Sequence, residues 1–181
     1  MKILHKWSVE DYHRMIETGI LDGKPVELLK GEIIEMSPEG IPHSFTNDSI
    51  AEYLREQLRG IAKVREAHPV TLDDSEPEPD ISVVRLPNTI YAQHHPYAQD
   101  IYWLIEIANN SLDKDLNEKR TLYASSGIPE YWIVDLKHKK LWVFTKPQND
   151  DYSQIQELTS GTITPLAFPN IVIEIARLLI I

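Results

Sequence analysis

The chain has 181 residues, 42% hydrophobic and 25% charged, which is typical of one folded domain with a hydrophobic core. It contains no cysteine, which excludes disulfides, thiolate zinc sites and cysteine nucleophiles. The formal net charge of −10 argues against tight non-specific binding of nucleic acid, because such binding depends on basic surface. No apolar run reaches the roughly 18 residues of a membrane span, and the apolar part of the N-terminus is too short for a secretory signal. We therefore expect a cytoplasmic protein without a membrane segment, folded as a single domain over residues 1–181.

Hydrophobic periodicity and turn residues predict the elements of the first half. Ser8 and Asp11 match a capping box at the start of the first helix. Lys30 and Gly31 form the turn of a predicted hairpin. The expected order is helix, two hairpin strands, helix and strand, at residues 9–18, 26–29, 33–36, 44–59 and 63–72. The inward stripe of the second helix comprises Asn47, Ile50, Ala51, Leu54 and Leu58.

The second half follows an acidic, proline-rich loop over residues 73–79. Gly127 is a suitable C-cap for the helix that starts at Leu112. The remaining strands are expected at residues 81–86, 102–108, 131–135, 141–144 and 155–158, and the apolar end at 171–181 fits either a strand or a helix. This order predicts an α/β (mixed α+β) fold, with helices on both sides of a central mixed sheet.

Two carboxylates and one lysine stand out because they interrupt apolar elements. Asp80 opens the strand at 81–86, and Glu106 is the one carboxylate in the nearly continuous apolar run 101–108. At 100° per residue, Lys119 falls in the middle of the stripe formed by Leu112, Leu116 and Tyr123. A buried charge is costly unless an opposite charge or a metal meets it. The three residues therefore predict a site that combines a metal with a lysine.

Each of these residues also has a simpler structural interpretation. Asp80 fits a solvated acid at the end of an acidic loop, and Glu106 fits an edge-strand residue that faces water. Lys119 fits a side chain that extends from the rim of its helix to solvent. All three simple interpretations would have to hold together for the site to be absent.

Three further residues are supporting candidates. His43 and Asn47 lie on the inward face of the second helix near its start, where a core or capping histidine is the simpler interpretation. Glu32 follows the hairpin turn, where a surface strand residue is the simpler interpretation. The alternative for each is a supporting role beside the metal site.

Short motifs along the chain occur in a specific order. They are residues 27–38 (Glu-Leu-Leu-Lys-Gly-Glu-Ile-Ile-Glu-Met-Ser-Pro), His43, Pro79-Asp80, residues 105–107 with Ser111, Lys119, and residues 127–135. In this order they resemble the Uma family of restriction endonucleases, in the PD-(D/E)XK nuclease superfamily, over about residues 8–179. The resemblance implies a restriction-endonuclease-like fold, with Pro79-Asp80 at the first acidic position and Glu106 at the second. The lysine expected two residues after the glutamate is replaced by Ala108, and Lys119 is similar to a migrated replacement.

These observations lead to the hypothesis of an endonuclease that hydrolyses DNA phosphodiester bonds with Mg²⁺ or Mn²⁺. Asp80 and Glu106 would hold the metal with the Ile107 carbonyl as a third ligand, and Lys119 would position the attacking water. One alternative is a non-catalytic regulator that binds nucleic acid or protein on a nuclease scaffold. Another is a structure-specific resolvase or repair nuclease. A homodimer is also expected if the apolar end 171–181 forms an interface, and a monomer if that end packs on its own core.

Overall fold

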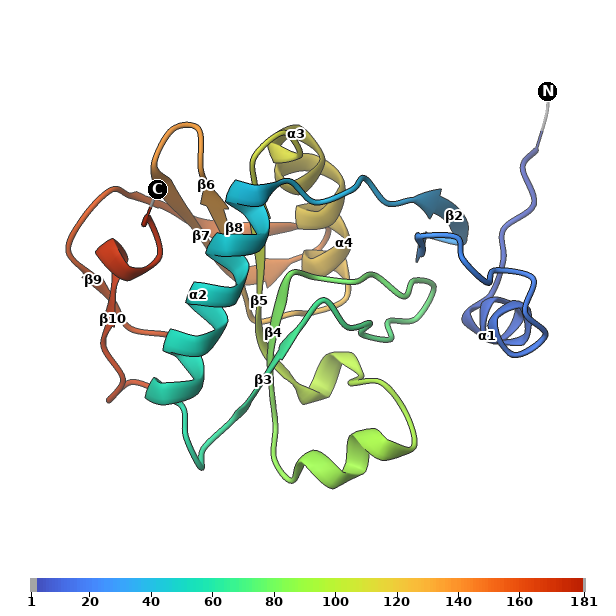
Figure 1. Cartoon of the computed structure of the whole chain (residues 1–181), viewed down its shortest axis with the longest axis horizontal. Coiled ribbons are helices and arrows are strands. Elements are labelled where there is room, and N and C mark those ends of the chain that lie inside the picture. Colours follow the sequence, from blue (N-terminus) through green and yellow to red (C-terminus); the bar gives the residue numbers. More distant parts are fainter. Residues whose placement is uncertain (1–2, 181) are drawn as a thin grey trace.

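A six-stranded sheet forms the centre of the computed structural model, which describes residues 3–180 (Figure 1). Strands β5 and β6 are parallel, and every other neighbouring pair is antiparallel. The sheet is therefore mixed, as predicted. In spatial order the strands are β3 (Lys63–Glu66), β4 (Ile81–Val84), β5 (Ile101–Ala108), β6 (Glu130–Asp135), β7 (Lys140–Gln148) and β8 (Asp151–Leu158).

Helices cover both faces of this sheet. On one face, Ile50 and Leu54 of α2 (Ile41–Gln57) pack with Trp103 of β5. On the other face, Leu122 and Tyr123 pack with the alternate residues of β5, which include Leu104 and Ala108. This second helical segment runs through α3 (Leu112–Lys114), the π-helical η3 (Asp115–Lys119) and α4 (Arg120–Ser125). Because β5 is covered on both faces, any charged side chain in it is enclosed.

The N-terminal part projects to one side of the sheet in Figure 1. It consists of α1 (Val9–Glu17) and a separate hairpin of β1 (Val26–Leu29) and β2 (Glu32–Glu35). The hairpin is joined to the main body by backbone bonds between Leu28 and Glu76, at N–O distances of 2.7 and 3.4 Å. The short remaining elements are η1 (Asn88–Ala92), η2 (Ala98–Asp100), β9 (Thr162–Ile163), β10 (Ile173–Glu174) and η4 (Ile175–Arg177).

Several predicted boundaries are wrong. The strand predicted over 81–86 ends at Val84, and the strands predicted over 141–144 and 155–158 are longer in the structure, as β7 and β8. Two further differences have a clear physical cause. The strand predicted over 63–72 ends at Glu66, because Ala67 has a φ of 43° and turns the chain out of the sheet. The second helix begins at Ile41 rather than residue 44, because Pro42 in its first turn needs no backbone hydrogen-bond donor. This earlier start brings residues 41–43 into the helix end that faces β4 and β5.

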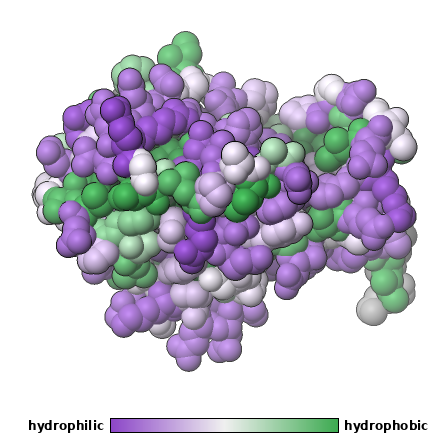
Figure 2. Space-filling view, turned by 90° about the horizontal axis from the view of Figure 1, so that it is seen from below, coloured by the Kyte–Doolittle hydropathy of each residue, from purple (hydrophilic) through white to green (hydrophobic). Residues whose placement is uncertain are grey.

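The ambiguous C-terminal end becomes part of the core. Ile173, Ile175 and Leu178 are fully buried in the cluster on the α2 face of the sheet, while Ile181 lies outside the described residues. This is the packing expected if the apolar end covers its own core. Seen from below, the surface is mainly hydrophilic and is crossed by one band of hydrophobic side chains (Figure 2). Within residues 3–180, no helix is long and apolar enough to cross a membrane.

The core on the α2 face predicts the effect of a single truncation. Replacing the fully buried Leu54 by alanine should lower the free energy of unfolding by about 2–5 kcal/mol, because it leaves a cavity against the sheet. Chemical denaturation checks this. Phe45→Ala, at an exposed position of the same helix, is the control and should change stability by no more than about 0.5 kcal/mol. Equal effects of the two substitutions would contradict the assignment of this face.

Candidate active site

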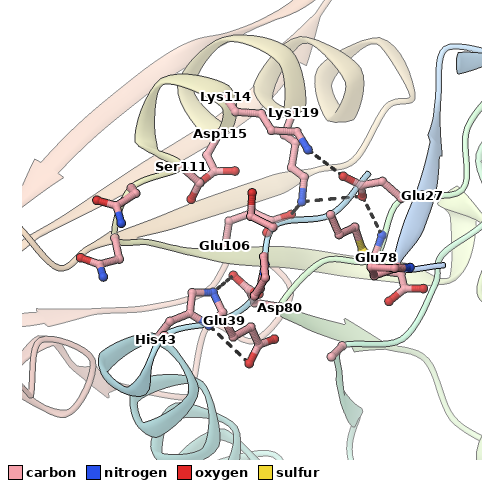
Figure 3. Close-up of a pocket in the computed structure, with 18 residues that line it drawn as sticks. Glu27, Glu39, His43, Glu78, Asp80, Glu106, Ser111, Lys114, Asp115 and Lys119 are labelled. Atoms are coloured by element: carbon pink, nitrogen blue, oxygen red, sulfur yellow. Dashed lines mark hydrogen bonds and ion pairs between the residues drawn. The ribbon is translucent and has the colours of Figure 1, made fainter. Parts of the chain in front are cut away.

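A cavity of about 650 Å³ opens where the start of α2, the approach to β4, the end of β5 and the start of the α3–η3 segment meet (Figure 3). Its lining is strongly acidic, because six carboxylates face two lysines and one histidine. The charged and ionisable residues are Glu27, Glu39, His43, Glu78, Asp80, Glu106, Lys114, Asp115 and Lys119. Asn109, Asn110 and Ser111 complete the polar part of the wall. The cavity therefore suits a bound cation, because its carboxylates outnumber its cationic side chains.

The register of β4 and β5 places Asp80 beside Glu106. Ile81 lies opposite Ile105 in the antiparallel pair, so the next position on each strand is Asp80 and Glu106. Asp80 Oδ2 accepts a hydrogen bond from the Ile107 backbone N–H at 2.6 Å and lies 3.1 Å from His43 Nε2. These bonds engage one carboxylate oxygen and hold the side chain toward the cavity, as Figure 3 shows.

Glu106 forms a buried ion pair with Lys119. Lys119 Nζ donates to Glu106 Oε1 at 2.8 Å, and the Tyr123 hydroxyl donates to the same oxygen at 2.7 Å. The two charged side chains are 3% and 7% exposed, so neither charge is relieved by bulk water. Burial raises the pKa of Glu106 above its ordinary value although Lys119 opposes the shift. Both donors reach Oε1, which leaves Oε2 for another partner.

The π-helical turn explains why Lys119 points inward. The predicted stripe of Leu112 and Leu116 is only half-buried, whereas Asp115, Lys119 and Tyr123 are buried. The wider turn at η3 thus buries Asp115 and Lys119 more deeply than Leu112 and Leu116, which pack at the edge of the same cluster. Burial alone would lower the pKa of Lys119, but the carboxylates around it, led by Glu106 and followed by Glu27, raise that pKa above its ordinary value.

The hairpin supplies a second carboxylate for the lysines. Glu27 of β1 lies 2.8 Å from Lys114 Nζ and 4.0 Å from Lys119 Nζ. Its other contact is the backbone N–H of Glu78, which donates to Oε2 at 3.2 Å. Burial opposes ionisation of Glu27, but the two lysines lower its pKa below the ordinary value. Glu27 therefore serves as the shared counter-ion on this side of the cavity.

Asp115 approaches the cavity from the helix side. It lies one turn before Lys119, and the Ser111 hydroxyl donates to its Oδ2 at 2.7 Å. Burial raises its pKa, opposed by the charge of Lys119. Asp115 is thus a buried carboxylate with one hydroxyl donor beside the Glu106 pair.

A group with metal-ligand geometry lies at the start of α2. Glu39, His43 and Asp80 each place a ligand atom within 4.8 Å of the others. His43 Nδ1 is 3.7 Å from Glu39 Oε2, while Nε2 faces Asp80. Burial opposes protonation of His43, but Asp80 and Glu39 raise its pKa above the ordinary value. Carboxylate oxygens suit Mg²⁺ and Mn²⁺, and an imidazole suits Mn²⁺ as well, so the donor set around Asp80 fits either cation.

Four of the predicted residues meet in this one cavity: Asp80, Glu106, Lys119 and His43. Ile107 is adjacent through its backbone, which donates its N–H to Asp80. The simpler structural interpretation fails for each of the three residues. Glu106 and Lys119 are enclosed, and Asp80 is half-buried and bonded to His43.

Two supporting candidates lie elsewhere. Glu32 does not line the cavity; it lies on the exposed face of β2 and pairs with Lys6 instead. Asn47 is buried in α2, one turn beyond His43, and does not line the cavity either. The hairpin residue that reaches the cavity is Glu27, because β1 rather than β2 faces the main body.

The sequence carried weak signals for the residues that were missed. Asp115 precedes Lys119 by four positions, a spacing that places side chains on one helix face, whereas Glu39 lies before the start of α2 and has no such signal. Glu27 sits among apolar residues of a short strand, as Glu106 does. Lys114 and Glu78 have no comparable signal, because they reach the cavity only through the tertiary fold.

Comparisons with known proteins identify the family and support the fold. The Uma2 family model, described as "Putative restriction endonuclease", matches residues 9–176. A solved structure described as "a putative nuclease belonging to DUF820 from Anabaena variabilis ATCC 29413" is similar, with a TM-score of 0.70 at 18% sequence identity. The match covers 85% of this chain and 89% of that one, which confirms the predicted fold. No curated protein matches the chain significantly.

The buried pair predicts a stability change that depends on its partner. Lys119→Met should lower the free energy of unfolding by about 3–5 kcal/mol near neutral pH, because Glu106 is left buried without its cation. Chemical denaturation in EDTA, which removes divalent metal, measures this change in the free energy of unfolding. The free energy of unfolding of Lys119→Met should fall as the pH rises above 4.5, the ordinary pKa of glutamate, because the enclosed Glu106 carboxyl without its cation resists the ionisation that the unfolded chain undergoes.

The control for this effect is the double variant Glu106→Gln/Lys119→Met. It removes both charges, so it should recover most of the lost stability and lose the added pH dependence. A double variant as unstable as Lys119→Met at every pH would show that the ion pair does not explain the loss.

Proposed function

The chain belongs to the Uma2 family, and from this premise and the geometry of the cavity we propose that it is a divalent-metal-dependent DNA endonuclease. The observation that carries the proposal is the joint placement of Asp80, Glu106 and Lys119 on one cavity wall. Phosphodiester hydrolysis needs a held cation, an activated water and a positive group beside the developing negative charge. The three side chains provide for each of these requirements.

Asp80 and Glu106 are the proposed metal ligands, with the Ile107 carbonyl as a third. One oxygen of each carboxylate is already engaged, Asp80 Oδ2 by the Ile107 N–H and Glu106 Oε1 by Lys119 and Tyr123. The other oxygen of each is the proposed contact to Mg²⁺ or Mn²⁺. Bound there, the cation would acidify a water and neutralise charge on the phosphoryl group.

Lys119 is proposed to orient the attacking water and to stabilise negative charge. Its ammonium is held in place by Glu106 at 2.8 Å and Glu27 at 4.0 Å, so it needs little reorganisation to act. Its raised pKa keeps it charged at neutral pH, which suits an electrostatic role and excludes its use as the general base. Its contact with Glu106 supports the interpretation of Lys119 as the migrated counterpart of the lysine that Ala108 replaces.

His43 is proposed to position Asp80. The imidazole contacts Asp80 through Nε2 and Glu39 through Nδ1, so it links the start of α2 to the metal ligand. With Glu39 it also offers an alternative cation position that shares Asp80. The two cation positions predict different effects of substitutions on metal affinity.

A homodimer is a further part of the proposal, because cleavage of both strands of a duplex needs two sites. Within the apolar C-terminal end, Ile173, Ile175 and Leu178 are buried in the core of their own chain and are therefore not available to an interface. A dimer detected by sedimentation would use other residues.

Cleavage of supercoiled plasmid and of branched DNA tests the activity. In Mg²⁺ or Mn²⁺ the wild type should nick or linearise DNA, and Asp80→Asn, Glu106→Gln and Lys119→Met should each lose at least about 10²-fold in rate. Glu32→Gln is the matched control, because it removes an exposed carboxylate outside the cavity, and should cleave at the wild-type rate.

The substrate and the pattern of loss separate the alternatives. Preferential cutting of branched DNA would support the structure-specific nuclease. Binding of either DNA without cleavage in any divalent metal would support the non-catalytic regulator and contradict the endonuclease. Equal traces of cleavage in wild type and Glu106→Gln would mark contamination.

Metal titration by calorimetry tests the ligands independently of cleavage. If Mn²⁺ binds between Asp80 and Glu106, both Asp80→Asn and Glu106→Gln should weaken its affinity by about 10-fold or more, while Glu39→Gln should change it little. The reverse pattern, with loss in Glu39→Gln and none in Glu106→Gln, would place the cation at the His43 group. Unchanged binding in Asp80→Asn would contradict both positions.

A further inference from the structure

A second cavity, of about 630 Å³, lies along the edge strand β3 and has the opposite charge to the acidic one. Three cationic side chains and one histidine line it, against a single carboxylate. The lining residues used below are Arg55, Lys63, Arg65, Glu66, His68 and Tyr91. We call this surface the β3 groove. A basic groove is unexpected on a chain whose formal net charge is −10, and it indicates an anionic partner.

Two of the three cationic side chains of the β3 groove form no ion pair with a carboxylate among the residues that the structure describes. The one carboxylate, Glu66, pairs with Arg55. Within residues 3–180, Lys63 and Arg65 have no carboxylate partner. Lys63 and Arg65 alternate with the buried Val64 along β3, so both project from the same face of the strand.

Contacts with Pro69 and Tyr91 hold the Arg65 guanidinium in one orientation, although no carboxylate among the described residues neutralises its charge. Its Nη1 donates to the Pro69 carbonyl at 3.3 Å, and its guanidinium carbon lies 5.7 Å from the centre of the Tyr91 ring. Burial lowers the pKa of Arg65, which reflects the cost of keeping this charge half-buried. An oriented, half-buried guanidinium without a carboxylate is suited to a phosphate oxygen.

The β3 groove and the acidic cavity are lined by neighbouring residues at the end of β3. Glu66 and His68 line the groove, while Ala67 between them lines the acidic cavity. The Ala67 backbone N–H donates to the Asp80 carbonyl at 3.0 Å, so the end of β3 is bonded to the residue that opens the proposed metal site. From Lys63 to Glu66 the strand spans about 10 Å, at about 3.3 Å per residue.

This length suits a nucleic-acid backbone. One strand of duplex DNA carries one phosphate per about 3.4 Å of helix axis, so the span corresponds to about three nucleotides. The exposed edge of β3, with Asn88 and Thr89 opposite, adds neutral hydrogen-bond donors beside the cations.

We infer that the β3 groove binds the phosphodiester backbone of duplex DNA next to the bond cut in the acidic cavity, with Lys63 and Arg65 as the phosphate contacts. This inference rests on the proposed endonuclease function. It explains how an acidic protein holds a polyanion: the metal site draws one phosphate into the acidic cavity, and the groove holds the flanking phosphates. Such contacts give affinity and register but no sequence preference.

The salt dependence of DNA binding tests this inference. Fluorescence anisotropy of a labelled duplex with Ca²⁺ present, at a series of salt concentrations, gives the slope of log affinity against log salt. Lys63→Gln should reduce the magnitude of the slope by about 1, and Lys63→Gln/Arg65→Gln by about 2, because each removes one phosphate contact. Affinity should fall alike for unrelated duplex sequences. A denaturing gel checks that the duplex stays intact.

Lys146→Gln is the matched control. Lys146 is an exposed lysine of β7, which three strands of the sheet separate from β3. It should keep the wild-type slope. If Arg65→Gln fails to fold, because it loses its contacts to Pro69 and Tyr91, the single variant Lys63→Gln decides alone. A wild-type slope in Lys63→Gln, or an equal loss in Lys146→Gln, would overturn the inference, as would an absence of duplex binding by the wild type.

These outcomes are distinguishable from failure of the proposed function. A reduced slope in Lys63→Gln without plasmid cleavage by the wild type would support the β3 groove and contradict the endonuclease. Cleavage by the wild type with an unchanged slope in Lys63→Gln would do the reverse.

Discussion

The structure of the site depends on the buried ion pair between Lys119 and Glu106. Neither charge would be stable in this enclosed position alone, so the pair ties the η3 turn to the middle of β5. The carboxylates of Glu27 and Asp115 surround the ammonium and leave an excess of negative charge in the cavity. That excess is the physical reason to expect a divalent cation at a wall where Asp80 and Glu106 meet. A stable fold requires that the buried carboxylates be neutralised, whereas a metal site requires that they stay ionised. Lys119 meets both requirements, because its ammonium offsets the charge of Glu106 and leaves Oε2 for another partner.

Sequence patterns found the centre of this site because its residues break strong local patterns. Glu106 interrupts an apolar strand and Lys119 an apolar stripe, and the sheet with helices on both faces follows from the same periodicity. The patterns failed where position depends on distant contacts. Glu27 reaches the cavity only because the Leu28–Glu76 bridge docks the hairpin on the main body, so a local interpretation chose Glu32 instead. The π-helical turn that buries Asp115 has no periodic signature, and Ala67 ends β3 through a backbone conformation that composition does not predict.

The net charge of −10 looks inconsistent with a DNA-cleaving protein, but the charge is unevenly distributed. Carboxylates concentrate around the proposed metal site, where a cation would offset them, and unpaired basic side chains lie along β3. One short connection joins the two regions, because Ala67 lies between them in the chain and bonds to Asp80. The partner of this protein is therefore better inferred from the distribution of charged side chains along the sheet edge than from the net charge of the chain.

We propose that the cavity wall formed by Asp80, Glu106 and Lys119 holds a divalent cation. Anomalous diffraction from a crystal grown with Mn²⁺ tests it most directly, because the signal locates the ion without reference to activity. We expect a manganese peak in contact with Asp80 and with Glu106 Oε2, while Lys119 stays bonded to Oε1. A peak bound by Glu39 and His43 without Glu106, or no peak at this wall, would contradict it.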